Sequence, residues 1–180
     1  MLPIAGLAAL SATAQEASAV SAYVDTSYLF LIGGLIVMFM AAGFLCLESG
    51  LVRSKNASMQ SLKYVSLFSV AGLMFWLIGY IIAYPASTAL NGIIGIPGAI
   101  PWSGEESLDT GYAASSDWFF QMVFVATAAS IVSGTVAERV KLWSFLIFVV
   151  FLTAFIYPTV VSWEWGGGYL GSEWGCSDFA

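Results

Sequence analysis

The sequence predicts an all-α integral membrane protein, a polytopic helical bundle with about four transmembrane helices. Hydrophobic residues make up 59% of the 180 residues, charged residues only 9%, and the mean hydropathy is +0.88. Soluble domains carry about 25% charged residues. The apolar runs are continuous rather than alternating, which excludes an outer-membrane barrel. The net charge of −6 argues against nucleic acid as a partner.

The start of the chain, residues 1–14, is predicted to be a signal peptide. Leu2 to Leu10 is apolar but too short to span a bilayer, and Ala12 and Ala14 have the small-x-small spacing of a cleavage site. Because no Lys or Arg precedes the apolar stretch, an apolar N-terminal tail is the alternative. If residues 1–14 are removed, the mature N-terminus lies outside.

Four longer apolar stretches follow, each without Lys, Arg, Asp or Glu. A stretch of about 20 apolar residues crosses the hydrocarbon core as a helix, which satisfies its backbone hydrogen bonds internally. The expected transmembrane helices are about 28–47, 64–84, 118–136 and 142–161, and a long outer loop covers 85–117.

All five basic residues fall into two short connections. Arg53, Lys55 and Lys63 lie between the first and second stretches, and Arg139 and Lys141 lie between the third and fourth. Cytoplasmic loops are enriched in Lys and Arg. We therefore expect loops 48–63 and 137–141 in the cytoplasm, with the acidic, Trp- and Gly-rich segments outside.

Residue types for catalysis are scarce. The chain has no histidine, which removes the usual group that titrates near neutral pH, and it has no CxxC spacing. We expect no enzyme activity, no catalytic residues, no metal and no cofactor. The charged residues at the cytoplasmic helix ends, such as Arg53 and Glu138, are expected to set topology or to pair locally.

Aromatic residues are the remaining candidates for a binding site. Phe120 and Phe124 are spaced i,i+4 on one helix face, and a stripe of small residues that includes Ala126 and Ser130 occupies the other. Trp165 precedes three glycines, and an indole face beside acidic residues attracts cations. The alternative is that the phenylalanines fill the core or face lipid and that the tryptophan belongs to an interfacial belt.

Four ordered motifs resemble those of the ammonium transporter, methylammonium permease and Rhesus protein family. The resemblance covers nearly everything from about Asp25 to the end of the chain. The motifs are G-L-V-R-S-K-N at 50–56, G-T-V-A-E-R at 134–139, W-G-G-G at 165–168 and D-F-A at 178–180.

The resemblance implies an ammonium transmembrane transporter of the cell (inner) membrane. It assigns Phe120 and Trp165 to an external recruitment site for ammonium or methylammonium, Phe124 to a gate beneath it, and Asp178 to a buried supporting role. It also implies a homotrimer and, in a full-length form, a cytoplasmic nitrogen-regulatory protein as partner. Ammonium would be attracted at the aromatic mouth and lose its proton before the dry pore, because an unpaired buried charge is far more costly than neutral ammonia.

The family has eleven membrane helices, so the resemblance places this sequence at helices one to four and the beginning of the fifth. We therefore expect it to be part of a longer protein, with the pore histidines beyond Ala180. Two alternatives stay open, namely an ammonium sensor of the same fold that does not conduct and a structural subunit of a membrane complex.

Overall fold

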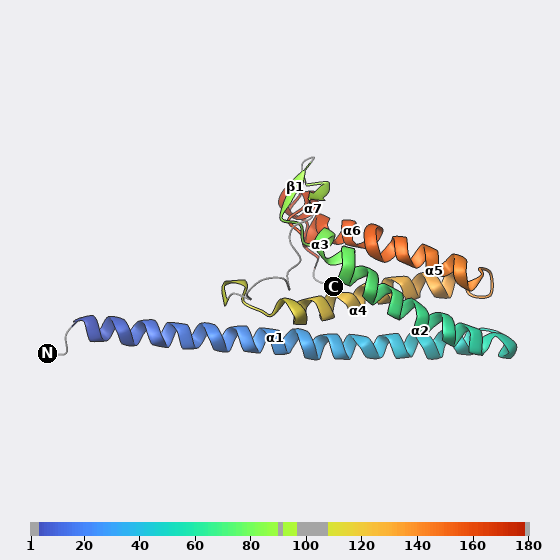
Figure 1. The fold of residues 1–180 in the computed structure, drawn as a ribbon, viewed down its shortest axis with the longest axis horizontal. Helices are drawn as coiled ribbons and strands as arrows, with labels where there is room; N and C mark the ends of the chain where they lie inside the picture. Colours follow the sequence, from blue (N-terminus) through green and yellow to red (C-terminus); the bar gives the residue numbers. More distant parts are fainter. Residues whose placement is uncertain (1–3, 90–91, 97–107, 179–180) are drawn as a thin grey trace.

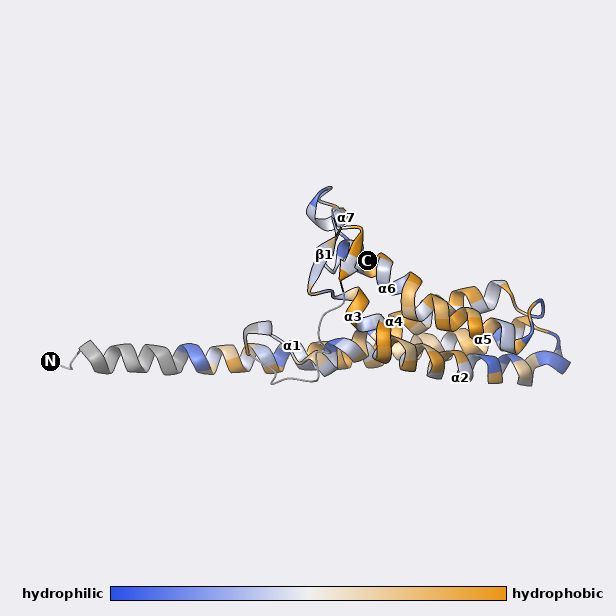
Figure 2. Ribbon diagram, turned by 45° about the horizontal axis from the view of Figure 1, so that its top comes forward, coloured by the Kyte–Doolittle hydropathy of each residue, from blue (hydrophilic) through white to orange (hydrophobic). Residues whose placement is uncertain are grey.

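The computed structural model describes residues 4–89, 92–96 and 108–178 of the chain (Figure 1). It contains four helical stretches that are long and apolar enough to cross a membrane by length and composition: Gln15–Leu51, Ser54–Ala83, Ala114–Thr135 and Leu142–Ser172. This confirms the predicted helical bundle with four spans. Figure 2 shows hydrophobic residues along most of the bundle and hydrophilic residues where α1 turns into α2.

The first span is part of one continuous helix, α1 (Ile4–Leu51), of 48 residues. It runs beside α4 and extends well past the other helices at its N-terminal end (Figure 1). The predicted signal peptide falls mostly within this helix, because residues 4–14 continue into the first span without a break, and residues 1–3 lie outside the described residues. Large apolar side chains such as Ile36 and Phe39 are exposed on α1, as expected for a lipid-facing helix.

The second and fourth spans each contain a π-helical turn. The second consists of η1 (Ser54–Asn56), α2 (Ala57–Met74), the π turn η2 (Phe75–Gly79) and α3 (Tyr80–Ala83). The fourth consists of α5 (Leu142–Phe151), the π turn η5 (Leu152–Ile156) and α6 (Tyr157–Glu164), and the short α7 (Tyr169–Ser172) follows. Pro158 lacks an N–H and its ring would clash with the carbonyl four residues earlier, so η5 lies where a regular α-helix is disfavoured.

The third span, α4 (Ala114–Thr135), is the central helix of the bundle. It packs against α1 on one side and α2 on another. Ala126, from the predicted small-residue stripe, is buried in a core with side chains of the second span, and Ser130 is fully buried. A second core cluster joins α1, α2, α4 and α5 around Leu67, Ala129 and Phe145.

Two of the expected loop boundaries differ from the structure. Helix α2 begins at Ala57, so Lys63 is not a loop residue as predicted but lies inside the helix and is 5% exposed. Its ammonium group donates to the Ser133 carbonyl at 3.1 Å and lies 4.9 Å from the ring centroid of Phe145. Because these groups surround its ammonium, Lys63 can lie inside an apolar helix, although hydropathy assigns it to the loop.

The outer loop also contains regular structure. Its last residues belong to α4, which begins at Ala114, and η4 (Leu108–Thr110) precedes it. The short strands β1 (Ser87–Ala89) and β2 (Ile94–Ile96) pair antiparallel, with Ser87 opposite Ile96. The sequence analysis did not anticipate this pair, because three-residue strands give no usable period.

The two ends of the bundle differ in composition. We call the end that holds Arg53, Lys63 and Arg139 the basic end, and the opposite end, where α4 begins and α6 stops, the aromatic end (Figure 1).

Candidate functional site

A file of aromatic rings lies along the N-terminal half of α4 at the aromatic end. The rings of Phe120 and Phe124 are 5.1 Å apart between centroids in an edge-to-face arrangement. Phe30 of α1 lies 5.4 Å from Phe120 and 5.1 Å from Tyr112, which precedes α4. Edge-to-face rings at 4.5 to 7 Å attract each other. The structure therefore brings the two predicted phenylalanines together and adds Phe30 and Tyr112 to them.

Close packing of α1 positions this file. A β-carbon at Gly33 would lie 3.0 Å from the Phe120 ring, closer than ordinary van der Waals contact. The glycine thus lets the α1 backbone approach α4 and leaves room for the ring. The sequence predicts that the small-residue stripe of α4 mediates helix packing. At Phe120, however, the small residue that allows close packing is Gly33 of α1.

Trp165 stands at the end of α6, where the W-G-G-G motif turns the chain. Its backbone N–H still bonds the Val161 carbonyl at 2.9 Å, while its side chain is 58% exposed. A β-carbon at Gly166 would collide with the Ala83 carbonyl, and Gly167 has a φ of +72°, which favours glycine. The motif therefore forms a tight turn that seals the end of α6 against the end of α3 and holds Trp165 at the aromatic end.

Trp165 and the phenylalanine pair share one end of the bundle but do not touch. Within residues 4–89, 92–96 and 108–178, no ring pair joins Trp165 to Phe120 or Phe124. The described chain thus places them as separate elements of one end of the molecule.

Asp178 has a different environment from the buried one that the resemblance implies. It is exposed, and its backbone N–H donates to the Glu164 carboxylate at 3.0 Å. The contact ties the last described residues to the end of α6, next to Trp165.

The aromatic end also holds a buried carboxylate, Asp117, that the sequence did not predict as a site residue. Asp117, in the first turn of α4, is only 3% exposed and accepts a hydrogen bond from the Tyr80 hydroxyl at 2.6 Å and a longer one from Gln121 at 3.4 Å. Burial, and then the negative charge of Asp117, raise the pKa values of Tyr84 and Tyr112. In the sequence, the only signal for this residue is its position as an acid directly before an apolar span. That position assigns it to the outer loop rather than to the helix.

At the basic end, two of the recognised motifs contact each other. Glu138 of G-T-V-A-E-R accepts hydrogen bonds from the Arg53 backbone at 3.0 Å and from the Asn56 amide at 2.6 Å, and forms an ion pair with Arg53 at 3.3 Å. The Asn56 bond first, and then the Arg53 backbone, lower the pKa of Glu138. Arg53 and Glu138 thus have a structural role, but they pair across 85 residues of sequence rather than locally, and both motifs join helices here.

A buried polar cluster lies deeper at the same end. Glu48 accepts hydrogen bonds from the Gln60 amide and from the Ser133 hydroxyl, the latter at 2.8 Å, and is 3% exposed. Lys63 donates to the Ser133 backbone beside it. The cluster links α1, α2 and α4, and its two bonds to Ser133 of α4 join groups that are 70 and 85 residues apart in the sequence.

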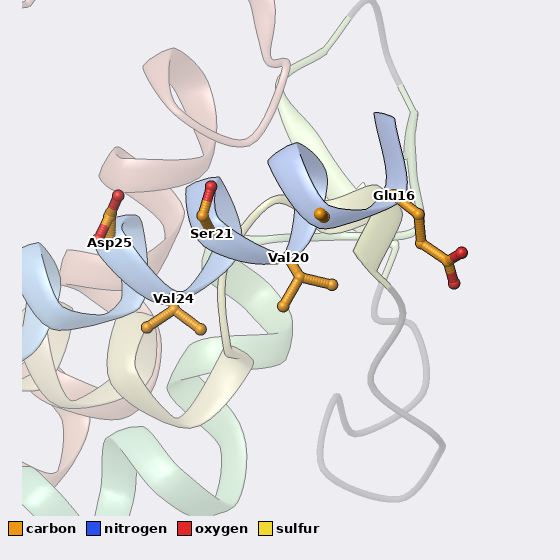
Figure 3. Close-up of a pocket in the computed structure, with 6 residues that line it drawn as sticks. Glu16, Val20, Ser21, Val24 and Asp25 are labelled. Carbon is orange, nitrogen blue, oxygen red and sulfur yellow. The ribbon is translucent and has the colours of Figure 1, made fainter. Parts of the chain in front are cut away.

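The hollows of the surface do not coincide with the aromatic file. One hollow, of about 590 Å³, is lined only by α1 residues, with Glu16 at one end and Asp25 at the other (Figure 3). A hollow on one helix face gives no opposing wall for a ligand. Among the described residues, no group of three or more His, Cys, Asp and Glu is arranged to hold a metal ion.

Comparison with known proteins agrees with the motifs and the fold. The model of the Ammonium Transporter Family matches residues 28–180. The chain belongs to the ammonium transporter family. Its helices are those of a multi-pass membrane protein, and the curated relatives carry transporter rather than enzyme names.

Individual relatives show how much of a family member this chain represents. It is 41% identical over 144 residues to the ammonium transporter Amt2 of Archaeoglobus fulgidus, covering 79% of this chain and 29% of that protein. It is 31% identical over 163 residues to the ammonium transporter of Bacillus subtilis, covering 87% and 38%. A solved Sensor Amt Protein superposes with a TM-score of 0.69 at 30% identity, covering 80% of this chain and 35% of that one. The chain spans about a third of the length of these relatives.

Proposed function

We propose that this chain is the N-terminal part of an ammonium transporter and forms the outer recruitment site for ammonium. The observation that carries the proposal is the Phe120–Phe124 ring pair at the aromatic end, where Trp165 is also exposed. Membership of the ammonium transporter family supplies the substrate class.

The proposed chemistry starts at exposed aromatic faces. Ammonium and potassium ions are similar in size, so a selective site uses more than radius. An ion over an aromatic face gains about 0.5 to 2 kcal/mol by cation–π attraction. We assign this first contact to Trp165 and Phe120, which present aromatic surface at one end of the bundle.

Phe124 is proposed as the upper gate, because it lies one helical turn deeper along α4 than Phe120. Beyond it, an apolar path favours neutral ammonia, since an unpaired charge inside a membrane protein is costly. Net charge is proposed to accompany the ammonia by a separate proton path. The remaining pore residues belong to the part of the family fold that this chain does not cover.

Asp178 is proposed to support the recruitment site without touching the substrate. Its backbone bond to Glu164 anchors it next to Trp165, which follows Glu164 in the chain. In this role its charge or its hydrogen bonds stabilise the turn that carries the indole.

The proposed setting is the cell (inner) membrane, with loops 48–63 and 137–141 in the cytoplasm and the mature N-terminus outside. It rests on all five basic residues lying at one end of the bundle. Residues 1–14 are proposed as a signal peptide. A homotrimer and a cytoplasmic nitrogen-regulatory partner are proposed for the complete protein on family grounds.

Transport is tested by reconstituting the complete protein in liposomes and recording currents evoked by ammonium. We expect a saturable inward current, and we expect Trp165→Leu and Phe120→Ala to raise the half-saturating concentration about 2- to 30-fold, the equivalent of the cation–π energy. The matched controls are Trp143→Leu and Phe39→Ala, which change residues that are 76% and 77% exposed and lie outside the proposed site. Wild-type current no larger than that of empty liposomes contradicts transport.

A sensor that binds ammonium without conducting it is the second candidate, favoured by the likeness to the Sensor Amt Protein. The same liposomes distinguish the two functions. A sensor shows saturable changes in tryptophan fluorescence that Trp165→Leu abolishes, while the current stays at the level of empty liposomes.

A further inference from the structure

Asp117 is a buried carboxylate that belongs neither to the recognised motifs nor to the proposed recruitment site. It lies in the first turn of α4 and is 3% exposed. Its partners in the described chain are two neutral groups, the Tyr80 hydroxyl at 2.6 Å and the Gln121 amide at 3.4 Å. Ionisable residues inside a membrane bundle are costly and are usually functional.

No basic side chain of this chain is near enough to neutralise this carboxylate. All five basic residues of the chain lie between 53 and 63 or between 139 and 141. The most deeply buried of them, Lys63, donates to Ser133, which is about 24 Å from Asp117 along the α4 axis at 1.5 Å per residue. The N-terminal end of α4 contributes only a partial positive charge.

The groups that face Asp117 confirm that its surroundings are neutral. Tyr80 comes from α3, Gln121 from α4 itself, and Tyr84 and Tyr112 from the segments that flank these helices. Burial, and then the negative charge of Asp117, raise the pKa values of Tyr84 and Tyr112. Phenols and amides stabilise the carboxylate but leave its charge uncompensated.

The position of Asp117 along α4 relates it to the aromatic file. Residues three and seven positions apart lie on the same side of a helix, one and two turns away. Phe120 and Phe124 stand at these positions relative to Asp117. The charge of Asp117 therefore lies one helical turn from Phe120, on the N-terminal side of the phenylalanine pair.

We propose that Asp117 is a specificity-determining residue for small monovalent cations at the aromatic end. Its fixed negative charge, held away from solvent by Tyr80 and Gln121, lowers the energy of ammonium or methylammonium beside Phe120 without contacting the ion. The role rests on the proposed recruitment site and adds an electrostatic component to it. Neutral ammonia gains nothing from this field.

A structural role for Asp117 predicts something different. The Tyr80–Asp117 hydrogen bond ties α3 to α4, and loss of this tie would reduce stability and maximal transport rate. Loss of charge alone would change the apparent affinity for the cation. Asn at position 117 separates the two roles, because its amide oxygen still accepts the Tyr80 hydrogen bond.

The test measures the uptake of labelled methylammonium by liposomes containing the complete protein, at low ionic strength. For Asp117→Asn we expect KM to rise about 6- to 30-fold, from Coulomb's law at separations of about 8 to 15 Å and an effective dielectric constant of about 20. The maximal rate should stay within about twofold, because the charge acts on the encounter with the cation. Asp117→Glu keeps the charge and should restore the low KM.

Gln121 provides variants that leave Asp117 intact. Gln121→Lys introduces a cation next to the carboxylate, because the Gln121 amide lies 3.4 Å from Asp117. It should raise KM as Asp117→Asn does, so it decides the question if Asp117→Asn fails to fold. Gln121→Met removes the same hydrogen bond without adding charge and should leave KM unchanged.

Three outcomes overturn the inference. In the first, Asp117→Asn and Gln121→Lys have a KM within about twofold of the wild type, while Phe120→Ala still raises KM. This outcome supports the recruitment site and contradicts the electrostatic role of Asp117. Another is an equal rise in KM for Gln121→Met and Gln121→Lys, which indicates a structural role. Wild-type liposomes without methylammonium uptake would instead overturn the proposed function, and this role with it.

Discussion

Charged side chains at the basic end and at the aromatic end of the bundle differ in the partners that they bind. At the basic end, Glu138 is bound by Arg53 and Asn56, and Lys63 by the Ser133 carbonyl. At the aromatic end, Asp117 is bound only by neutral groups, and no basic residue of the chain lies there. Charged residues at the basic end hold helices together, whereas Asp117 at the aromatic end has no basic partner in this chain.

This difference separates motifs that build the fold from residues that we propose act on a substrate. The G-L-V-R-S-K-N and G-T-V-A-E-R motifs are the most recognisable parts of the sequence, yet their charged residues bind each other. The aromatic file and Asp117 are less distinctive in the sequence but are the groups that we propose attract a cation. A recognisable motif therefore identifies the family here more than it identifies the site.

The largest expected effect concerns which end faces outward. In a variant with Cys46→Ala, native Cys176 should react with a membrane-impermeant maleimide in intact cells. In a variant with both native cysteines replaced and Lys55→Cys introduced, labelling should require permeabilised cells, because Lys55 lies at the basic end. The contrast should be all or none. Labelling of Lys55→Cys in intact cells would reverse the assignment of the two ends.

A smaller effect is expected from removing a buried cation at the basic end. Lys63→Met should lower the free energy of unfolding by about 2 kcal/mol, since it leaves the buried Ser133 carbonyl without its donor and Glu48 without a nearby cation. Lys55→Met makes the same chemical change at an exposed position and should have little effect. Thermal unfolding in detergent measures both. Equal stability of the two variants would mean that the buried ammonium is not part of the architecture.

The smallest effect is expected at Glu138, where the ion pair is exposed to solvent. Its pKa in the folded protein is lowered below the usual 4.5, mainly by the Asn56 hydrogen bond. A lowered pKa means that the stabilisation is present above pH 4.5 and is lost as the pH falls through the folded value. Unfolding of wild type and Glu138→Gln across this range should show a small difference at neutral pH that disappears in acid. A difference that grows in acid would contradict this sign.

Hydropathy, basic-residue spacing and i,i+4 spacing predicted the four spans and the proximity of Phe120 to Phe124. These properties are local, so a short window of sequence contains all the information they need. The same local reading placed Lys63 in a loop, because a cation lowers hydropathy wherever it stands. Its buried position depends on Ser133 and Phe145, which come from other helices.

The sequence by itself determined the membrane class, the number of spans, the end that carries the basic residues and the family. Only the tertiary structure decided that Glu138 closes the basic end on Arg53 and that Gly33 makes room for Phe120. Only the tertiary structure, too, buried Asp117 beside Tyr80 without a basic partner. Apolar length is a sum over neighbouring residues, whereas a charge becomes structural or functional according to what the rest of the fold places next to it.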